Sequence, residues 1–112
     1  MEFMNRIEIR GVIGRVNVRQ YGGRDCANFS VVTDYTYKNK DGQAFVETTW
    51  FEVTAWKDEA HGKKIVTLNE LEKGKGVHVI GRLRQRSYTD ESGETRRSYE
   101  LIASVVEIVP RD

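Results

Sequence analysis

Apolar and polar residues alternate along most of this chain, and the alternation predicts five long β-strands. In residues 5–20 the apolar positions follow a period of two, with a phase slip at Gly11. A glycine at such a slip favours a bulge or a sharp bend. The same period marks four further segments, which are residues 26–37, 45–56, 77–88 and 96–109.

Polar, glycine-containing stretches separate most of the predicted strands. Residues 21–25 and 38–42 are typical turns, and an acidic turn at residues 90–94 joins the last two strands. The last two strands are expected to form a hairpin.

The segment between the third and fourth strands has a different period. Ile65, Leu68 and Leu71 recur at helical spacing before Gly74, which predicts a short helix over residues 64–73. Five strands with a helix between the third and fourth predict an all-β OB-fold, a small Greek-key barrel. An SH3-like barrel fits less well, because it lacks that helix.

Composition limits the class of protein. A chain of 112 residues makes one domain, and 31% charged with 38% hydrophobic residues is ordinary for a globular protein. No apolar stretch approaches the ~20 residues of a membrane span, so no membrane association is expected. The single cysteine, Cys26, excludes an internal disulfide and fits a reducing cytoplasm.

Two tryptophans share the polar face of the third predicted strand. Because strand side chains alternate, Trp50 and Trp56 project beside Glu52 and Thr54. The opposite face is the better candidate for the core, and it consists of Phe51, Val53 and Ala55. Two large rings are therefore left on a polar face, unless a bulge shifts the register or they cover a barrel end or a subunit interface.

The predicted hairpin of residues 81–99 carries arginines on both arms. One face of its first arm is basic and then aromatic, presenting Arg82, Arg84, Arg86 and Tyr88, while Leu83 points towards the core. Such a face suits a phosphate backbone with unstacked bases beside it, although a merely solvated face is the alternative. The net charge of +1 argues against binding by bulk electrostatics alone.

Catalytic and metal-binding patterns are weak in this sequence. His61, His78 and Cys26 do not have metal-ligand spacing, and the acids of the turn at residues 90–94 are expected to be solvated. Neither a phosphate-binding glycine loop nor a nucleophile elbow occurs. We therefore expect no enzyme, no metal and no cofactor, and keep a protein-interaction OB module as an alternative.

Six stretches, in order and at matching spacing, resemble the bacterial single-stranded-DNA-binding proteins over residues 4–109. They are Met4-Asn-Arg-Ile with Gly11-Val-Ile-Gly-Arg15, Ala27-Asn-Phe-Ser-Val-Val-Thr33, Thr49-Trp-Phe-Glu-Val53, Leu71-Glu-Lys-Gly74, Val79-Ile-Gly-Arg-Leu-Arg84 and Tyr88-Thr-Asp-Glu-Ser-Gly93. The resemblance implies sequence-independent binding and protection of single-stranded DNA in replication, recombination and repair, in the bacterial cytoplasm at the nucleoid.

The resemblance also implies particular site residues. Positions that stack DNA bases in the family correspond here to Tyr37, Trp50, Trp56 and Tyr88. Stacking on rings does not choose among bases, and basic side chains neutralise the phosphates. The candidate phosphate contacts are Arg82, Arg84, Arg86, Arg15, Arg97 and Lys38.

A homotetramer is implied as well, with residues 6–15 pairing edge to edge between subunits. Pairing would also protect a long strand edge from aggregation. The expected contact residues are Arg6, Ile7, Glu8, Ile9 and Arg10, with Phe51 at a second contact or in the core.

The chain departs from the family at its end, which is Pro110-Arg-Asp112. Family members usually continue into a flexible linker and an acidic tip that recruits other enzymes, so tail-mediated recruitment is not expected from this chain. It is either an excised domain or a short paralogue. A tailless relative, the PriB-type primosomal replication protein, is usually dimeric and lacks the helix, so the predicted helix at residues 64–73 favours the tetrameric family.

Overall fold

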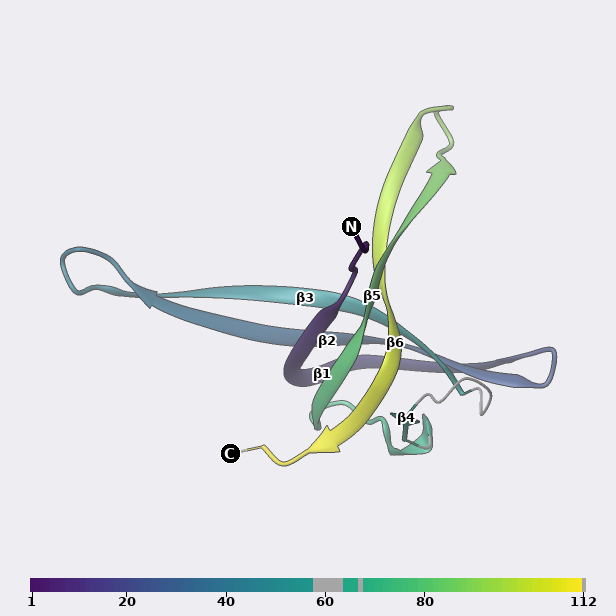
Figure 1. Ribbon diagram of the computed structural model, residues 1–112, viewed down its shortest axis with the longest axis horizontal. Helices are drawn as coiled ribbons and strands as arrows, with labels where there is room; N and C mark the ends of the chain where they lie inside the picture. The colour runs from purple at the N-terminus through teal and green to yellow at the C-terminus, as the bar shows by residue number, and fades with distance from the viewer. Residues whose placement is uncertain (58–63, 67, 112) are drawn as a thin grey trace.

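The computed structural model describes residues 1–57, 64–66 and 68–111, which form a set of long, strongly curved strands (Figure 1). The elements are β1 (Ile7–Tyr21), β2 (Arg24–Lys38), β3 (Ala44–Lys57), β4 (Lys64–Ile65), the 3-10 helix η1 (Leu68–Glu70), β5 (Gly76–Thr89) and β6 (Thr95–Val109). The five long strands coincide with the predicted segments to within two residues at each end.

The long strands close into a ring. Their hydrogen-bonded order is β3-β2-β1-β5-β6, and a short parallel pairing of Val53 with Leu101 and of Thr54 with Ile102 joins β3 to β6. All other pairings between neighbouring long strands are antiparallel among the described residues. This arrangement confirms the predicted five-stranded barrel architecture.

The inner face of the ring is apolar. Its largest fully buried side chains include Phe29, Ile13, Leu101, Val31 and Val53. Ala55 is also buried, and Phe51 is partly buried against the same cluster. The prediction that the apolar face of the third strand forms the core is therefore confirmed for Val53 and Ala55, with Phe51 at its margin.

β1 changes partners where it bends. Residues 7–12 pair with β5, and from Val12 onward the strand pairs with β2. The register against β2 shifts between Ile13 and Val16, where the Arg15 N–H donates to Ser30 Oγ at 2.8 Å. The irregularity thus lies a few residues after the predicted slip at Gly11. Gly11 lies where the strand changes partners, and a Cβ there would collide with the Val32 carbonyl.

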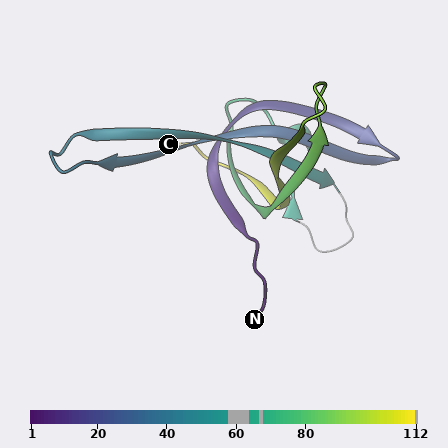
Figure 2. The ribbon, with the colours of Figure 1, turned by 90° about the horizontal axis from the view of Figure 1, so that it is seen from above.

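Three hairpins extend beyond the ring (Figures 1 and 2). This extension corrects the prediction that Leu83 points into the core. Its side chain lies on the inner parity of β5 but is 41% exposed. Leu101, its cross-strand partner, is only 2% exposed, so the core ends between these two residues and the hairpin continues into solvent.

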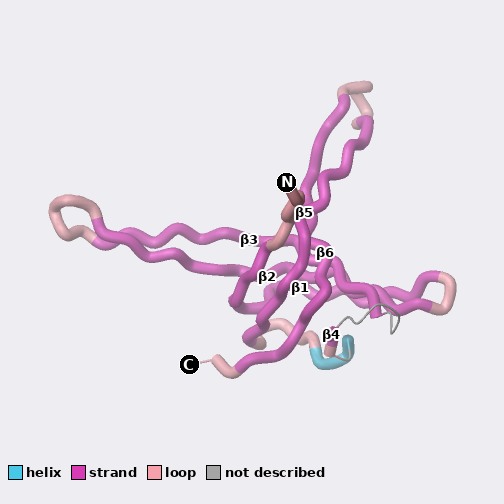
Figure 3. The backbone as a smooth tube through the Cα atoms, in the orientation of Figure 1, coloured by secondary structure: helices cyan, strands magenta, loops and turns pink. Residues whose placement is uncertain are grey.

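The predicted helix is much shorter than expected. Residues 64–65 form β4, which pairs in parallel with β6, and the helix among the described residues of this segment is the 3-10 turn η1 (Figure 3). Ile65, Leu68 and Leu71 are all buried, so the periodic apolar residues do face the core, but without a regular α-helix. A short helix between β3 and β5 is confirmed, whereas the extent of residues 64–73 is wrong. Most of the predicted polar loop at residues 57–62 lies outside the described residues.

Candidate nucleic-acid interface

The two tryptophans lie on the outer face of β3, as predicted. They alternate with inward-facing residues and flank Glu52 and Thr54, and their partners on β2 are Val32 for Trp50 and Cys26 for Trp56. Trp50 is 58% exposed, which is unusual for so large an apolar ring and marks it as a candidate contact surface.

Trp50 lies over the bulge of β1. A Cβ built on Gly14 would be 2.5 Å from the Cζ3 atom of the indole. The ring forms a shallow pocket with Gly14, Arg15, Ser30, Glu52 and Lys73. An exposed ring beside two basic side chains is suited to a base stacked on the indole and a phosphate near the cations.

Trp56 is more enclosed than the sequence suggested. Its ring centroid lies 5.9 Å from that of Tyr21, tilted by 51°, and the Arg24 guanidinium carbon is 4.8 Å from the centroid of the Trp56 ring. The side chain is half-buried. Neither Tyr21 nor Arg24 was identified from the sequence, although both flank the Gly22-Gly23 turn and so end up side by side across the hairpin.

The arginine-bearing face of β5 belongs to the same outer surface as the tryptophans. Thr54 on β3 donates to Glu100 Oε2 at 2.7 Å, and Arg84 on β5 donates to Glu100 Oε1 at 2.6 and 3.0 Å. Arg86 Nη1 is 3.5 Å from the same oxygen. One pocket is accordingly lined by Trp56, Thr54, Arg84, Arg86 and Glu100, among others. Trp56 and these two arginines, which are far apart in the sequence, meet here.

Other candidate cations are more dispersed. Arg15 pairs with Glu52 at 2.7 Å beside Trp50. Arg82 lines a separate hollow with Asn5 and Arg6. Arg97 lies opposite Ser87 on the face of the hairpin that is turned away from Arg84 and Arg86, and Lys38 lies near the tip of the β2–β3 hairpin. The structure therefore groups Arg15, Arg84 and Arg86 with the tryptophans and separates the other three.

The β2–β3 hairpin carries a second group of rings. Tyr35, Tyr37 and Phe45 stack in a row, with centroid distances of 6.2 and 5.5 Å. Because Phe45 has the inward parity of β3, this row lies on the opposite face of the ladder from Trp50. The sequence predicted Tyr37 as a stacking residue but did not point to Phe45. Phe45 lies opposite Tyr37 because the turn occupies residues 39–43, one residue later than the predicted turn at residues 38–42.

Tyr88 lies near the tip of the β5–β6 hairpin and is 54% exposed. The adjoining turn is more ordered than expected from its acidic sequence. Asp90 Oδ1 accepts the N–H groups of Ser92 and Glu94, and Arg96 Nε donates to Asp90 Oδ2 at 2.8 Å. The bond from Arg96 makes the largest contribution to lowering the pKa of Asp90, and together the hydrogen bonds lower that pKa to about 2. Asp90 therefore shapes the turn, in contrast to the expected solvated acid.

The predicted subunit edge is available in this chain. Residues 7–11 are paired with β5 on one side, and no other strand among the described residues pairs with their second side. Ile7 and Ile9 pack against the core, while Glu8 and Arg10 lie on the outer face. A strand edge with free N–H and C=O groups is able to pair with another chain.

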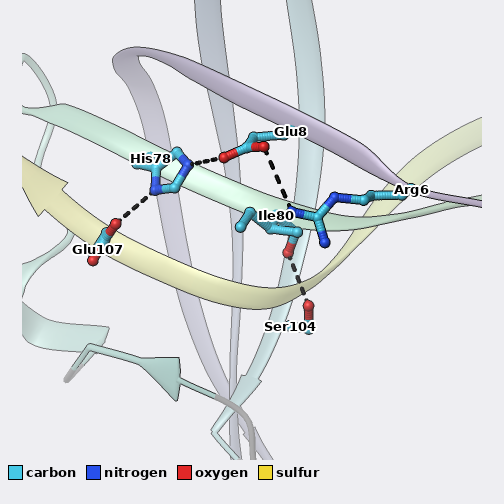
Figure 4. Close-up of polar contacts among 6 residues, drawn as sticks. All are labelled: Arg6, Glu8, His78, Ile80, Ser104 and Glu107. Atoms are coloured by element: carbon cyan, nitrogen blue, oxygen red, sulfur yellow. Dashed lines mark hydrogen bonds and ion pairs between the residues drawn. The ribbon is translucent and has the colours of Figure 1, made fainter.

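His78 bridges two carboxylates on that outer face (Figure 4). Its Nε2 lies 2.7 Å from Glu8 and its Nδ1 lies 2.6 Å from Glu107, so both ring nitrogens are bonded. The hydrogen bonds with Glu107 and Glu8 raise the pKa of His78, and the bond with His78 lowers the pKa of Glu8. A neutral imidazole has one N–H, so this geometry favours the doubly protonated ring.

The described part of the chain holds no group of three or more His, Cys, Asp or Glu residues that could bind a metal ion. His61, the other histidine considered, lies outside that part. Burial raises the pKa of the Cys26 thiol. Among the described residues, no helix is long and apolar enough to cross a membrane.

Comparisons with known proteins agree with this geometry. The model of the "Single-strand binding protein family" matches residues 4–109. The chain is 28% identical over 108 residues to the single-stranded DNA-binding protein of Neisseria meningitidis, covering 95% of this chain and 60% of that protein. It is 29% identical over 110 residues to that of Deinococcus radiodurans, covering 96% and 35%. The chain thus spans 60% or less of the length of these relatives.

Two solved structures share the fold. The Plasmodium falciparum SSB in complex with ssDNA superposes with a TM-score of 0.81 at 19% identity, covering 98% of both chains. A deletion mutant of the single-stranded DNA binding protein from Thermus aquaticus gives a TM-score of 0.74 at 18% identity, covering 96% of this chain and 51% of that one. These superpositions confirm the OB-fold predicted from the strand pattern.

Proposed function

Because this chain belongs to the single-strand binding protein family, we propose that it binds single-stranded DNA without sequence preference and protects it during replication, recombination and repair. The observation that carries the proposal is the 58% exposed ring of Trp50 beside the Arg15 guanidinium. Stacking on an aromatic side chain is worth about 1–3 kcal/mol per base and tolerates any base.

The proposed strand follows the outer surface from Trp50 to Trp56 and on to the arginines of β5. Along this path Arg15, Arg84 and Arg86 contact phosphates, while Trp50 and Trp56 contact bases. Tyr88, on the β5–β6 hairpin, extends the path beyond the ring. Tyr37 is proposed as a further stacking position, on the opposite face of the β2–β3 ladder from Trp50. The role is one of binding, without catalysis, metal or cofactor, in the bacterial cytoplasm at the nucleoid.

The protein is further proposed to act as a homotetramer. The free edge of residues 7–11 supports pairing between two copies, with Arg6 flanking it, and Phe51 at the core margin supports a second contact. Light scattering at micromolar concentration should report four chains. A stable monomer would contradict the assembly.

A dimeric, PriB-type protein is the alternative at this point. The predicted helix at residues 64–73 favoured the tetrameric family over a PriB-type protein. Because only the short η1 turn is present in the described part of this segment, it does not distinguish the two. A stable dimer in the same experiment would favour the primosomal alternative.

The test of binding is a titration with oligothymidine followed by tryptophan fluorescence. Stacked bases quench indole emission, so saturable quenching is expected with single strands. A hairpin duplex of equal length serves as the control and should quench far less. Absence of quenching together with absence of a shift in a gel assay would contradict the proposed function.

A further inference from the structure

Two carboxylates lie among the groups proposed to hold DNA. Glu52 projects between Trp50 and Thr54 and pairs with Arg15 at 2.7 Å. Glu100 pairs with Arg84 at 2.6 Å and with Arg86 at 3.5 Å. The three arginines that the structure groups with the tryptophans are thus already bound to acids within the chain.

Glu100 is held firmly in this position. Its side chain is only 13% exposed, and each of its oxygens accepts a hydrogen bond, one from Thr54 and the other from Arg84. Partial burial raises the pKa of Glu100, but the bonds from Thr54 and Arg84 outweigh this effect and hold the pKa below its ordinary value. The free protein therefore presents an ionised carboxylate beside Trp56 at neutral pH.

An ionised carboxylate and a phosphate compete for the same partner. Both are hydrogen-bond acceptors, and both form charge-assisted bonds with a guanidinium. A phosphate that takes Arg84 also leaves the Glu100 carboxylate with one fewer cation and a like charge nearby. Glu52 is more exposed, at 54% of its side chain, so solvent screens the same conflict more strongly there.

If the chain binds single-stranded DNA as proposed above, its phosphates meet arginines that are already paired. We propose that Glu52 and Glu100 regulate DNA binding by competing with phosphate for these arginines, which are Arg15, Arg84 and Arg86. Each phosphate contact then forms by an exchange of ion-pair partners. The exchange lowers affinity below what three free arginines would give. It also favours release, because each carboxylate remains close enough to recover its arginine when the strand moves.

Isosteric substitutions test this competition. Glu100→Gln and Glu52→Gln keep the side-chain shape, and the amide oxygen introduced by Glu100→Gln would still accept the hydrogen bond from Thr54. Glu52→Gln should bind oligothymidine about two- to fivefold more tightly than the wild type at low salt, the range expected from an exposed ion pair. Glu100→Gln should gain at least as much, because its carboxylate is less exposed and less screened. The gain should shrink as salt rises, because screening weakens charge interactions. Glu70→Gln is the control. It removes the same charge from an exposed position on η1 and should leave affinity unchanged.

A second background identifies the partner of Glu100. In a variant carrying Arg84→Ala and Arg86→Ala, the further change Glu100→Gln should increase affinity by much less than it does in the wild type. An equal gain in both backgrounds, an equal gain from Glu70→Gln, or no gain from either of the Glu52 and Glu100 variants would overturn the inference. Failure of the wild type to bind oligothymidine would instead contradict the proposed function itself.

Discussion

The indole of Trp50 lies against Gly14, so closely that a Cβ at that position would be 2.5 Å from Cζ3 and 3.0 Å from Cη2. Gly14 belongs to the segment where the register between β1 and β2 shifts. The bulge therefore does more than bend the strand. Because Gly14 has no side chain, the Trp50 ring that carries the proposed function fits against it. Backbone geometry and binding chemistry are linked at this one contact.

Gly14→Ala should displace the Trp50 ring and weaken binding of oligothymidine. Contacts under 3.0 Å cannot persist, so either the indole rotates or the bulge moves. We expect several-fold weaker binding and a change in Trp50 emission, measured by fluorescence titration. In a Trp50→Ala background only the contact with Ser30 Oγ, at 2.9 Å, remains, so the added methyl group should have a smaller effect on affinity. An equal loss in both backgrounds would show that Gly14 acts elsewhere.

His78→Gln should destabilise the protein in a pH-dependent way. The folded state raises the pKa of His78 from 6.5, so the ion pairs are fully present below that value and are lost as pH rises through the folded pKa. Glu8, with its lowered pKa, is charged above about 4.5. Denaturant unfolding should therefore show the largest difference from the wild type between about pH 4.5 and 6.5, and a smaller one well above the pKa of the bridged imidazole.

Ser104→Ala provides the matched control for that titration. Ser104 lies on the same face and donates to the Ile80 carbonyl at 3.2 Å, but it does not titrate (Figure 4). Its effect on the free energy of unfolding should not vary over this pH range. A pH-independent effect of His78→Gln would contradict the role of the bridged imidazolium.

Much of the fold could be predicted because strand alternation is a local property. The period of two located all five long strands, and the alternation within residues 50–56 placed both tryptophans on the outer face. The burial of a side chain depends on which distant parts of the chain cover its strand, and the local sequence does not determine this. Leu83 and Leu101 pair directly, yet only Leu101 lies where the ring closes over it.

Contacts between distant strands explain the remaining differences. The bonds from His78 to Glu8 and Glu107 require the register of β1, β5 and β6 together, and no spacing in the sequence reveals it. The pairing of Arg84 with Glu100 follows from the hairpin register alone and could have been counted out from the turn at residues 90–94. At residues 64–65, pairing with β6 replaced the helix that the local period favoured.

Asp90→Ala should loosen the tip of the β5–β6 hairpin without unfolding the barrel. The variant loses the bonds to the Ser92 and Glu94 amides and the ion pair with Arg96. Hydrogen exchange measured by NMR should therefore become faster at residues 92 and 94, while the amide of Phe29 in the core stays protected. Asp90→Asn, which keeps an acceptor oxygen, should show a smaller change.

The wild-type carboxyl of Asp90 should titrate at about pH 2. Because its folded pKa is depressed from 3.8, the support it gives to the turn is present above that value and is lost as pH falls through about 2. A midpoint near 3.8 in the NMR titration would show that the hydrogen bonds at the turn do not form in solution.

The most direct measurement uses the fact that the chain has only two tryptophans. Trp56→Phe leaves Trp50 as the sole indole, and Trp50→Phe leaves Trp56, so each variant reports on one position during a titration with oligothymidine. We expect strong, saturable quenching of the exposed Trp50 and weaker quenching of Trp56, which is half-buried between Tyr21 and Arg24. Trp50→Ala should weaken binding by about tenfold, within the stacking energy of one base. Unquenched Trp50 emission in a protein that still binds the oligonucleotide would contradict this surface as the DNA-binding site.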